Sequence, residues 1–142
     1  MAIMRRMLIG GGAVAVVLAG SASAQAWTWA SSSNPIVMTG GGGYGNVNFG
    51  TGTFTLQSWL RDTKVGDGRV YAKAIAYTNS SGEWRADISS GLRTDGEATY
   101  ARMADKSNGV GSPASGFSYK VRTCRSVTLN DPCSTDVRSY NF

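Results

Sequence analysis

The feature that most constrains the fold is a repeated alternation of apolar and polar residues along short segments. Residues 54–61 (FTLQSWLR) place two Leu, Phe and Ser on one face and Thr, Gln, Trp and Arg on the other. Residues 83–88 and 117–123 alternate in the same way, and a period of two is typical of a half-buried β-strand. Residues 70–78 (VYAKAIAYT) are mostly apolar on both faces, which predicts a central strand covered on both sides.

Turn-forming residues separate these segments. Gly, Asp, Asn and Ser cluster between them, for example at residues 66–68 and 79–82, where they favour tight turns. Residues 98–103 fit a strand better than a short helix, and residues 136–142 fit a last strand. No segment has the pattern of a long amphipathic helix. The chain is therefore expected to be all-β, an antiparallel β-sandwich or a partly open barrel.

The first 26 residues have the pattern of a secretory signal peptide. Arg5 and Arg6 precede an apolar run at residues 8–19, and small residues follow it. We expect cleavage after Ala24 or Ala26. The run is too short to span a bilayer, which needs roughly 20 residues, so we expect a secreted protein without stable membrane insertion. The Arg pair is also compatible with twin-arginine export.

Two further regions follow the signal peptide. Residues 27–52 form a Trp- and Gly-rich segment, and residues 53–142 carry the predicted sandwich domain. Residues 40–45 are expected to be a flexible turn or linker, because ordering so many glycines costs backbone entropy. The alternation around Val47 suggests a short edge strand. Residues 104–116 are expected to form a long loop without secondary structure.

The charge balance argues against nucleic acid as a partner. The chain has 14 basic and 9 acidic residues, and removing Arg5 and Arg6 leaves 12 − 9 = +3. The basic residues are scattered, and only Lys120, Arg122 and Arg125 cluster. Nucleic-acid binding needs a concentrated basic stripe. The net positive charge favours weak, nonspecific attraction to anionic cell-wall polymers.

The residue types exclude several catalytic classes. The chain has no histidine, which excludes Ser-His-Asp triads, Cys-His pairs and HExxH zinc sites. Two cysteines without histidine cannot build a structural zinc site. The acidic residues are interpreted as solvated groups rather than as a glycosidase pair. Residues 61–68 (RDTKVGDG) fit a tight turn better than a calcium loop, since Lys64 stands where a ligand should be. No metal, cofactor or catalytic residue is predicted.

The only two cysteines, Cys124 and Cys133, are expected to form a disulfide bond. A secreted domain with an even cysteine count favours this pairing, and a redox pair would normally be Cys-x-x-Cys. The bond should close a ring between the last two strands. Arg125, Asn130 and Asp131 are then candidate binding residues that the ring displays.

The four tryptophans are expected mainly to pack within the fold, and a carbohydrate-binding surface is the alternative, because aromatic rings dominate many binding surfaces. Trp59 lies on the mixed face of its predicted strand, beside Gln57 and Arg61, and is the candidate binding residue. Trp84 is expected in the core. Trp27 and Trp29 are expected to dock as an edge strand near the new N-terminus.

The segments LRDTKVGDGRVYA and KVRTCRSVTLNDPCS support a resemblance over residues 54–142. The chain resembles small, uncharacterised secreted β-rich proteins of actinomycete type. The resemblance implies secretion, a β-sandwich and one disulfide, and it implies no catalytic residues. We therefore expect a non-catalytic extracellular binding protein whose partner is a cell-envelope glycan. The alternatives are an inhibitor or antimicrobial effector that acts on a secreted protein, and a carboxylate-based hydrolase.

Overall fold

The structure is a computed structural model that describes residues 25–50, 52–78, 85–110, 117–127, 129–134 and 138–141. The predicted signal peptide lies outside these ranges, except for Gln25 and Ala26. The described residues form ten strands and no helix. The strands are β1 (Gln25–Ala30), β2 (Ile36–Met38), β3 (Gly41–Gly50), β4 (Thr53–Asp62), β5 (Arg69–Thr78), β6 (Arg85–Ser89), β7 (Ala101–Arg102), β8 (Lys106–Gly109), β9 (Phe117–Ser126) and β10 (Arg138–Asn141).

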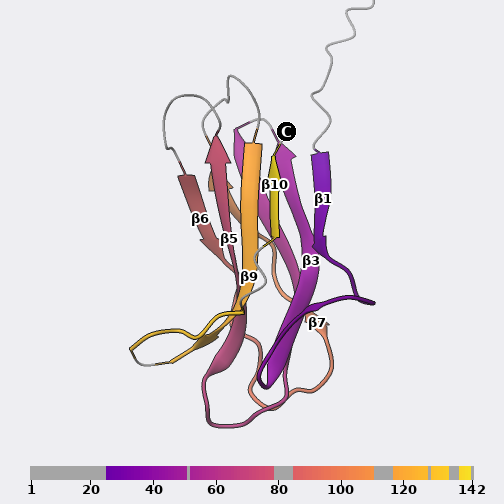
Figure 1. The fold of residues 1–142 in the computed structure, drawn as a ribbon, viewed down its shortest axis with the longest axis vertical. Helices are drawn as coiled ribbons and strands as arrows, with labels where there is room; N and C mark the ends of the chain where they lie inside the picture. The colour runs from indigo at the N-terminus through magenta and orange to yellow at the C-terminus, as the bar shows by residue number, and fades with distance from the viewer. Residues whose placement is uncertain are drawn as a thin grey trace, which may run out of the picture.

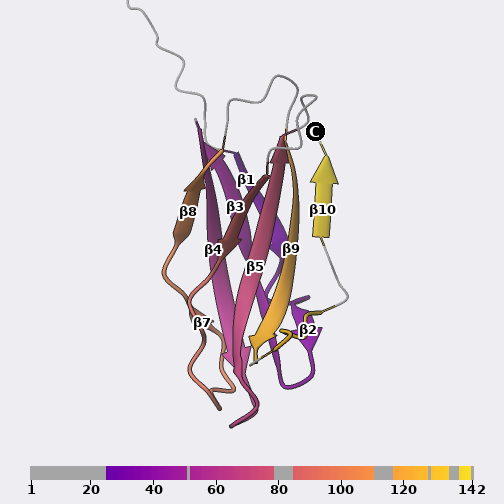
Figure 2. The same ribbon diagram turned by 90° about the vertical axis from the view of Figure 1, so that its left-hand side faces the viewer.

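Two antiparallel sheets make up the fold. The first sheet has the order β1-β3-β4-β7, with β2 paired to β3 and β8 paired to β4. The second sheet has the order β10-β9-β5-β6. The two sheets lie face to face (Figure 1), and the edge-on view separates β8, β4 and β3 from β5, β9 and β10 (Figure 2). The predicted antiparallel β-sandwich is confirmed.

The alternating pattern of the sequence becomes the core between the sheets. In β4 the even-numbered residues are buried, and the odd-numbered residues are partly exposed except Thr53, which is exposed. Trp29 of β1 is also buried, and its indole Nε1 donates a hydrogen bond to the Gln57 carbonyl at 3.2 Å. Burying such side chains stabilises the fold by about 1.5–3 kcal/mol each. The inner faces carry large residues on the first sheet and small ones on β5: Trp29, Val47, Phe54, Leu56 and Leu60 against Val70, Ala72, Ala74 and Ala76.

The expectation of a linker at residues 40–45 is wrong for Gly41–Gly45, which form the first half of β3. Strand β3 lies between β1 and β4, so it is also not an edge strand. The glycines are needed for close packing. A Cβ atom on Gly43 would lie 2.6 Å from a Leu60 methyl group and 2.7 Å from the Thr123 methyl group. Residues 27–52 are thus part of the same sheet as β4.

Three other strand predictions change in detail. Residues 106–109 form β8 inside the segment expected to be without structure, because they pair with Thr53–Leu56 of β4. Residues 98–103 contribute only the two-residue strand β7. The outer face of β5 is partly exposed, so β5 is central in its sheet but covered on one side only. Trp84 lies outside the described residues.

Candidate functional site

The predicted site residues lie in two separate regions. Trp59 is on the outer face of the first sheet. The disulfide ring, residues 124–133, leaves the end of β9 in the second sheet and projects to the left in Figure 1. The structure therefore does not bring Trp59 together with Asn130 and Asp131, which lie in two separate candidate sites.

Trp59 belongs to an aromatic cluster that spans three segments of the chain. It lies directly opposite Tyr44 in the β3–β4 pairing. The two rings are parallel within 2°, with 5.5 Å between their centroids. Tyr100 meets Tyr44 edge-on at 5.1 Å. All three rings are partly exposed, so they form an aromatic surface rather than part of the core.

Two arginines extend this surface. The guanidinium of Arg102 lies 5.4 Å from the centre of the Trp59 ring, and that of Arg61 lies 4.9 Å from the centre of the Tyr100 ring. Such cation–π contacts are favourable by about 0.5–1 kcal/mol at exposed sites. We define the aromatic face as Tyr44, Trp59, Arg61, Tyr100 and Arg102.

Polar groups border the aromatic face beside Arg102. Arg102 Nη2 donates to Asp105 Oδ1 at 3.1 Å, and Gln57 Nε2 donates to Asp105 Oδ2 at 3.1 Å. Burial raises the pKa of Tyr100, so its hydroxyl stays protonated at neutral pH. The face thus combines aromatic rings with amide, carboxylate and guanidinium groups.

Sequence reasoning found Trp59 but missed Tyr44 and Tyr100. Tyr44 stands in the glycine run that was expected to be a linker, and Tyr100 stands in a segment of ambiguous pattern. Only the pairing of β3 with β4 shows that Tyr44 faces Trp59. The polar segment 105–107 gave no sign that it would pack beside β4.

The predicted disulfide between Cys124 and Cys133 is confirmed. The backbone nitrogen of Arg125 donates to the Pro132 carbonyl at 2.9 Å, which pairs the two ends of the ring. A ring of about ten residues stabilises the folded state by roughly 2.5–3 kcal/mol in the chain-entropy model. Cys124 is buried and Cys133 is partly exposed.

Asp131 fixes the conformation of the ring. Its carboxylate accepts a hydrogen bond from the Val127 backbone nitrogen at 2.9 Å and from the Tyr71 hydroxyl at 2.6 Å. The Tyr71 hydrogen bond is the main reason that the pKa of Asp131 is lowered. Burial, followed by the same hydrogen bond, raises the pKa of Tyr71 to about 12. Asp131 therefore holds the ring against β5, while Asn130 is exposed beside it.

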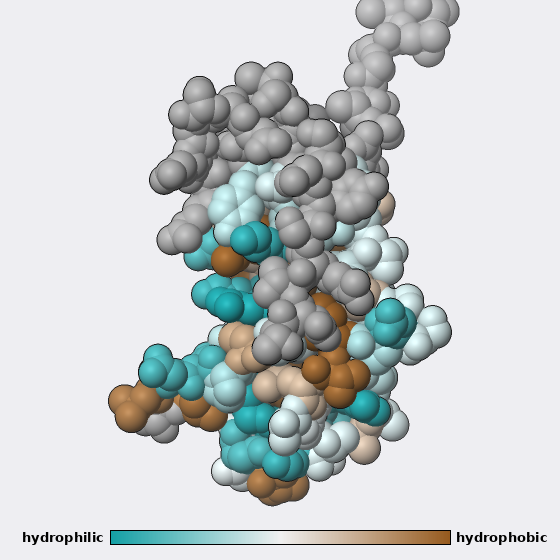
Figure 3. Space-filling view, in the orientation of Figure 1, coloured by the Kyte–Doolittle hydropathy of each residue, from teal (hydrophilic) through white to brown (hydrophobic). Residues whose placement is uncertain are grey.

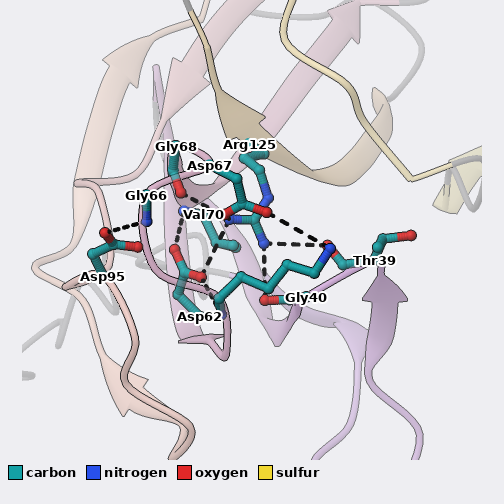
Figure 4. Close-up of polar contacts among 10 residues, drawn as sticks. Thr39, Gly40, Asp62, Gly66, Asp67, Gly68, Val70, Asp95 and Arg125 are labelled. Atoms are coloured by element: carbon teal, nitrogen blue, oxygen red, sulfur yellow. Dashed lines mark hydrogen bonds and ion pairs between the residues drawn. The ribbon is translucent and has the colours of Figure 1, made fainter.

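The expectation that the ring displays Arg125 is wrong. Residues 121, 123 and 125 of β9 point toward the interior, and Arg125 is only 4% exposed. Its Nη1 contacts the carboxylates of Asp62 and Asp67, and its Nη2 donates to the Gly40 carbonyl at 2.8 Å (Figure 4). Arg125 thus joins β9 to the end of β4 and to two turns, and it is a structural residue of the interior.

The same region contains three carboxylates that could hold a cation. One oxygen from each of Asp62, Asp67 and Asp95 lies within 4.8 Å of the others. However, the Arg125 guanidinium already supplies the positive charge beside Asp62 and Asp67. The Asp62 carboxylate also accepts hydrogen bonds from the backbone nitrogens of Lys64 and Val70, both at 3.2 Å. Asp62 and Asp67 are therefore paired within the protein, whereas among the described residues Asp95 accepts only a backbone hydrogen bond, from the Gly66 nitrogen to its Oδ2 at 2.9 Å.

An open groove lies beside the ring. It has a volume of about 770 Å³ and runs between Val37 and Met38 of β2 and Val127 and Pro132 of the ring. Val37 is 53% exposed and Val127 is 39% exposed. Leu129, at the tip of the ring, is 93% exposed, and Figure 3 shows hydrophobic surface on this projection. The ring therefore presents apolar groups as well as Asn130.

Within the described ranges, no helix is long and apolar enough to cross a membrane. Comparison with known proteins gives no assignment: no protein-family model, curated protein or solved structure matches the chain.

Proposed function

We propose that the protein is a secreted, non-catalytic binding protein and that its aromatic face binds a glycan of the cell envelope. The observation that carries this proposal is the cluster of Tyr44, Trp59 and Tyr100 on the outside of the first sheet. Large aromatic side chains gain most from contact with a ligand when they are held rigidly at a surface. The disulfide supports a location outside the cell, because such bonds persist in oxidising compartments.

The polar border of the aromatic face suits a sugar ligand. A sugar ring has an apolar face of C–H groups and a rim of hydroxyl groups. The aromatic rings can contact the first, and Gln57, Asp105 and Arg102 can exchange hydrogen bonds with the second. In the free protein these three side chains bond to one another, so their arrangement is set before a ligand arrives. Preorganisation of this kind lowers the entropy cost of binding.

The test is retention of the purified protein on insoluble peptidoglycan, chitin and cellulose. Retention of the wild-type protein on at least one polymer is expected, with about a 30-fold loss of affinity or more in Trp59→Ala, since loss of a central aromatic anchor costs about 2 kcal/mol or more. Tyr77→Ala is the matched control, because Tyr77 is a partly exposed aromatic residue on the second sheet. Gln57→Ala provides a variant that keeps all the rings. No retention on any of the polymers would refute the proposal.

A second candidate function is supported by the ring and the groove. Leu129 and Val127 are exposed on a ring that the disulfide and Asp131 hold in place. A rigid projecting loop with an apolar tip is suited to entering a pocket of another protein, as an inhibitor or antimicrobial effector would. In that case Leu129→Asp should abolish inhibition in a panel of secreted proteases, whereas Trp59→Ala should leave it unchanged.

A further inference from the structure

The outer face of the second sheet carries a group of basic side chains. The alternation of β5 buries Val70, Ala72, Ala74 and Ala76, so Lys73 points outward. Lys120 and Arg122 of β9 point to the same side. In the β5–β9 pairing, Lys73 lies directly opposite Arg122, and Lys120 lies opposite Ile75. This side faces the viewer in Figure 1, and Figure 3 shows hydrophilic surface over parts of it that grey atoms leave visible.

We define the cationic face as Lys73, Lys120 and Arg122. The ion pairs formed among the described residues use Lys64, Arg93, Arg102 and Arg125, and none uses a member of this face. Lys120 contacts the Tyr77 ring, with 5.7 Å from its Nζ to the ring centre. The basic groups are therefore not neutralised by salt bridges within the described part of the chain.

Among the described residues, the carboxylates of Asp87 and Asp131 lie near the cationic face. Asp131 is close enough to Lys73 for their charges to interact, but its oxygens already accept hydrogen bonds from Tyr71 and Val127. Asp87 of β6 is exposed and lies opposite Ile75. Neither carboxylate forms a salt bridge with the three basic residues, so the described side chains leave an excess of positive charge on this face.

The pairing of Lys73 with Arg122 has an energetic cost. Like charges directly opposite each other on neighbouring strands are destabilising. The packing of β5 against β9 does not require either charge, because both side chains point away from the core. A ligand with negative charge would remove the repulsion, so the pair is more favourable in a bound state than in the free protein.

We propose that the cationic face binds an anionic polysaccharide. Lys120 and Arg122 are two residues apart on one strand, which separates them by about 7 Å, and Lys73 widens the row toward β5. Successive acidic groups along an extended polymer can meet such a row on an open sheet surface. The choice of a polysaccharide over other polyanions rests on the proposed location outside the cell. The charge of the face does not depend on that proposal or on the aromatic face.

The test uses dextran sulfate as the polyanion and neutral dextran as its uncharged counterpart. The wild-type protein is expected to bind dextran sulfate and to release it as the salt concentration increases. It should not bind neutral dextran. Lys73→Gln/Lys120→Gln should bind about 25-fold more weakly, at about fivefold for each charge lost near a polyanionic surface.

Lys64→Gln/Lys106→Gln is the matched control. It lowers the net charge by the same amount at exposed sites away from the cationic face, and it should weaken binding by less than about threefold if the attraction is local. Equal losses of affinity for dextran sulfate in the two double variants would overturn the proposal. An affinity that neither double variant changes would also overturn it.

Three further measurements separate the outcomes. Tighter binding to single-stranded DNA of matched length than to dextran sulfate would overturn the assignment to a polysaccharide. Trp59→Ala should leave dextran sulfate binding unchanged. Absence of glycan binding by the aromatic face in the insoluble-polymer assay would therefore not affect this result.

Thermal unfolding of each variant checks that the fold is intact, which we expect because the substituted side chains lie outside the core.

Discussion

At the scale of single residues, Arg125 and Asp62 are the charged pair on which the end of the sandwich depends. Arg125 is 4% exposed and Asp62 is fully buried. Both charges are buried away from water, and each is stabilised by the other, because an unpaired buried charge is costly. Arg125 also donates hydrogen bonds to the backbone carbonyls of Gly40 and Gly68 in two turns. The Arg125–Asp62 pair therefore fixes the position of β9 relative to the end of β4 and to these two turns.

Replacing Arg125 by Ala should lower the free energy of unfolding by about 3–5 kcal/mol, because Asp62 would be left buried without its cation. Chemical denaturation of the two proteins measures the difference. Lys64→Gln is the control, since Lys64 forms only an exposed ion pair with Asp67, and its loss should cost about 1 kcal/mol or less. A similar small loss in Arg125→Ala would show that the buried pair does not stabilise the fold.

Asp131 and Tyr71 give the ring a pH dependence. The pKa of Asp131 is lowered in the folded protein. The contribution of this carboxylate to stability is therefore fully present above its pKa in the unfolded chain, which is near 4. This contribution is lost as the pH falls through the pKa of Asp131 in the folded protein. The pKa of Tyr71 is raised to about 12, so its contribution is complete below pH 10 and is lost between about pH 10 and 12. The ring contact should be strongest over the range between these limits.

We predict that Tyr71→Phe removes the pH dependence that arises from this contact. The difference in unfolding free energy between the wild-type protein and Tyr71→Phe should be constant from pH 5 to 9 and should shrink below about pH 4. Thermal or chemical unfolding at several pH values measures it. Tyr77→Phe serves as the control. A difference that is constant down to pH 2 would contradict the assigned role of Asp131.

At the scale of elements, β3 shows how a glycine-rich segment can form a central strand. Glycine is unfavourable in a strand because it loses much backbone freedom and has no side chain to pack. Here β3 pairs with β1, β2 and β4, and these hydrogen bonds outweigh the local preference. The absence of a side chain at Gly43 also lets Leu60 and Thr123 approach the strand.

Gly43→Ala should destabilise the protein by about 1–3 kcal/mol, because the added methyl group overpacks the core. Gly91→Ala is the matched control, since the added Cβ would lie 3.5 Å from the Met103 methyl group, an ordinary contact. Denaturant unfolding of both variants measures the two effects. If Gly43→Ala were as stable as Gly91→Ala, the close approach of the sheets at Gly43 would not be a constraint.

The elements also show which predictions the sequence supports and which it cannot. Strands β4, β5 and β9 follow from their alternation, and the disulfide follows from the cysteine count. The first half of β3 and all of β8 could not be predicted, because their residues have little strand preference and form strands through pairing with β4. Arg125 follows Cys124 in the ring motif, which suggests exposure, but its side chain continues the inward face of β9 that Val121 and Thr123 form.

At the scale of the whole molecule, the sandwich presents two chemically different outer faces. The first sheet carries the aromatic face, and the second sheet carries the cationic face. The disulfide ring and its apolar tip lie at one end of the second sheet. Because the core separates the two faces, each can be altered by substitution without changing the other. This separation makes the proposed binding activities independent of one another.

Glycan binding by the aromatic face can be tested directly by NMR. The indole N–H signals of the tryptophans are followed while a soluble fragment of the polymer that retains the protein is added. The Trp59 signal is expected to shift in a saturable manner, because its ring lies on the aromatic face. The Trp29 signal should stay in place, because Trp29 is buried and bonded to the Gln57 carbonyl. Saturable binding that leaves the Trp59 signal unchanged would contradict the assignment of the aromatic face as the glycan-binding surface.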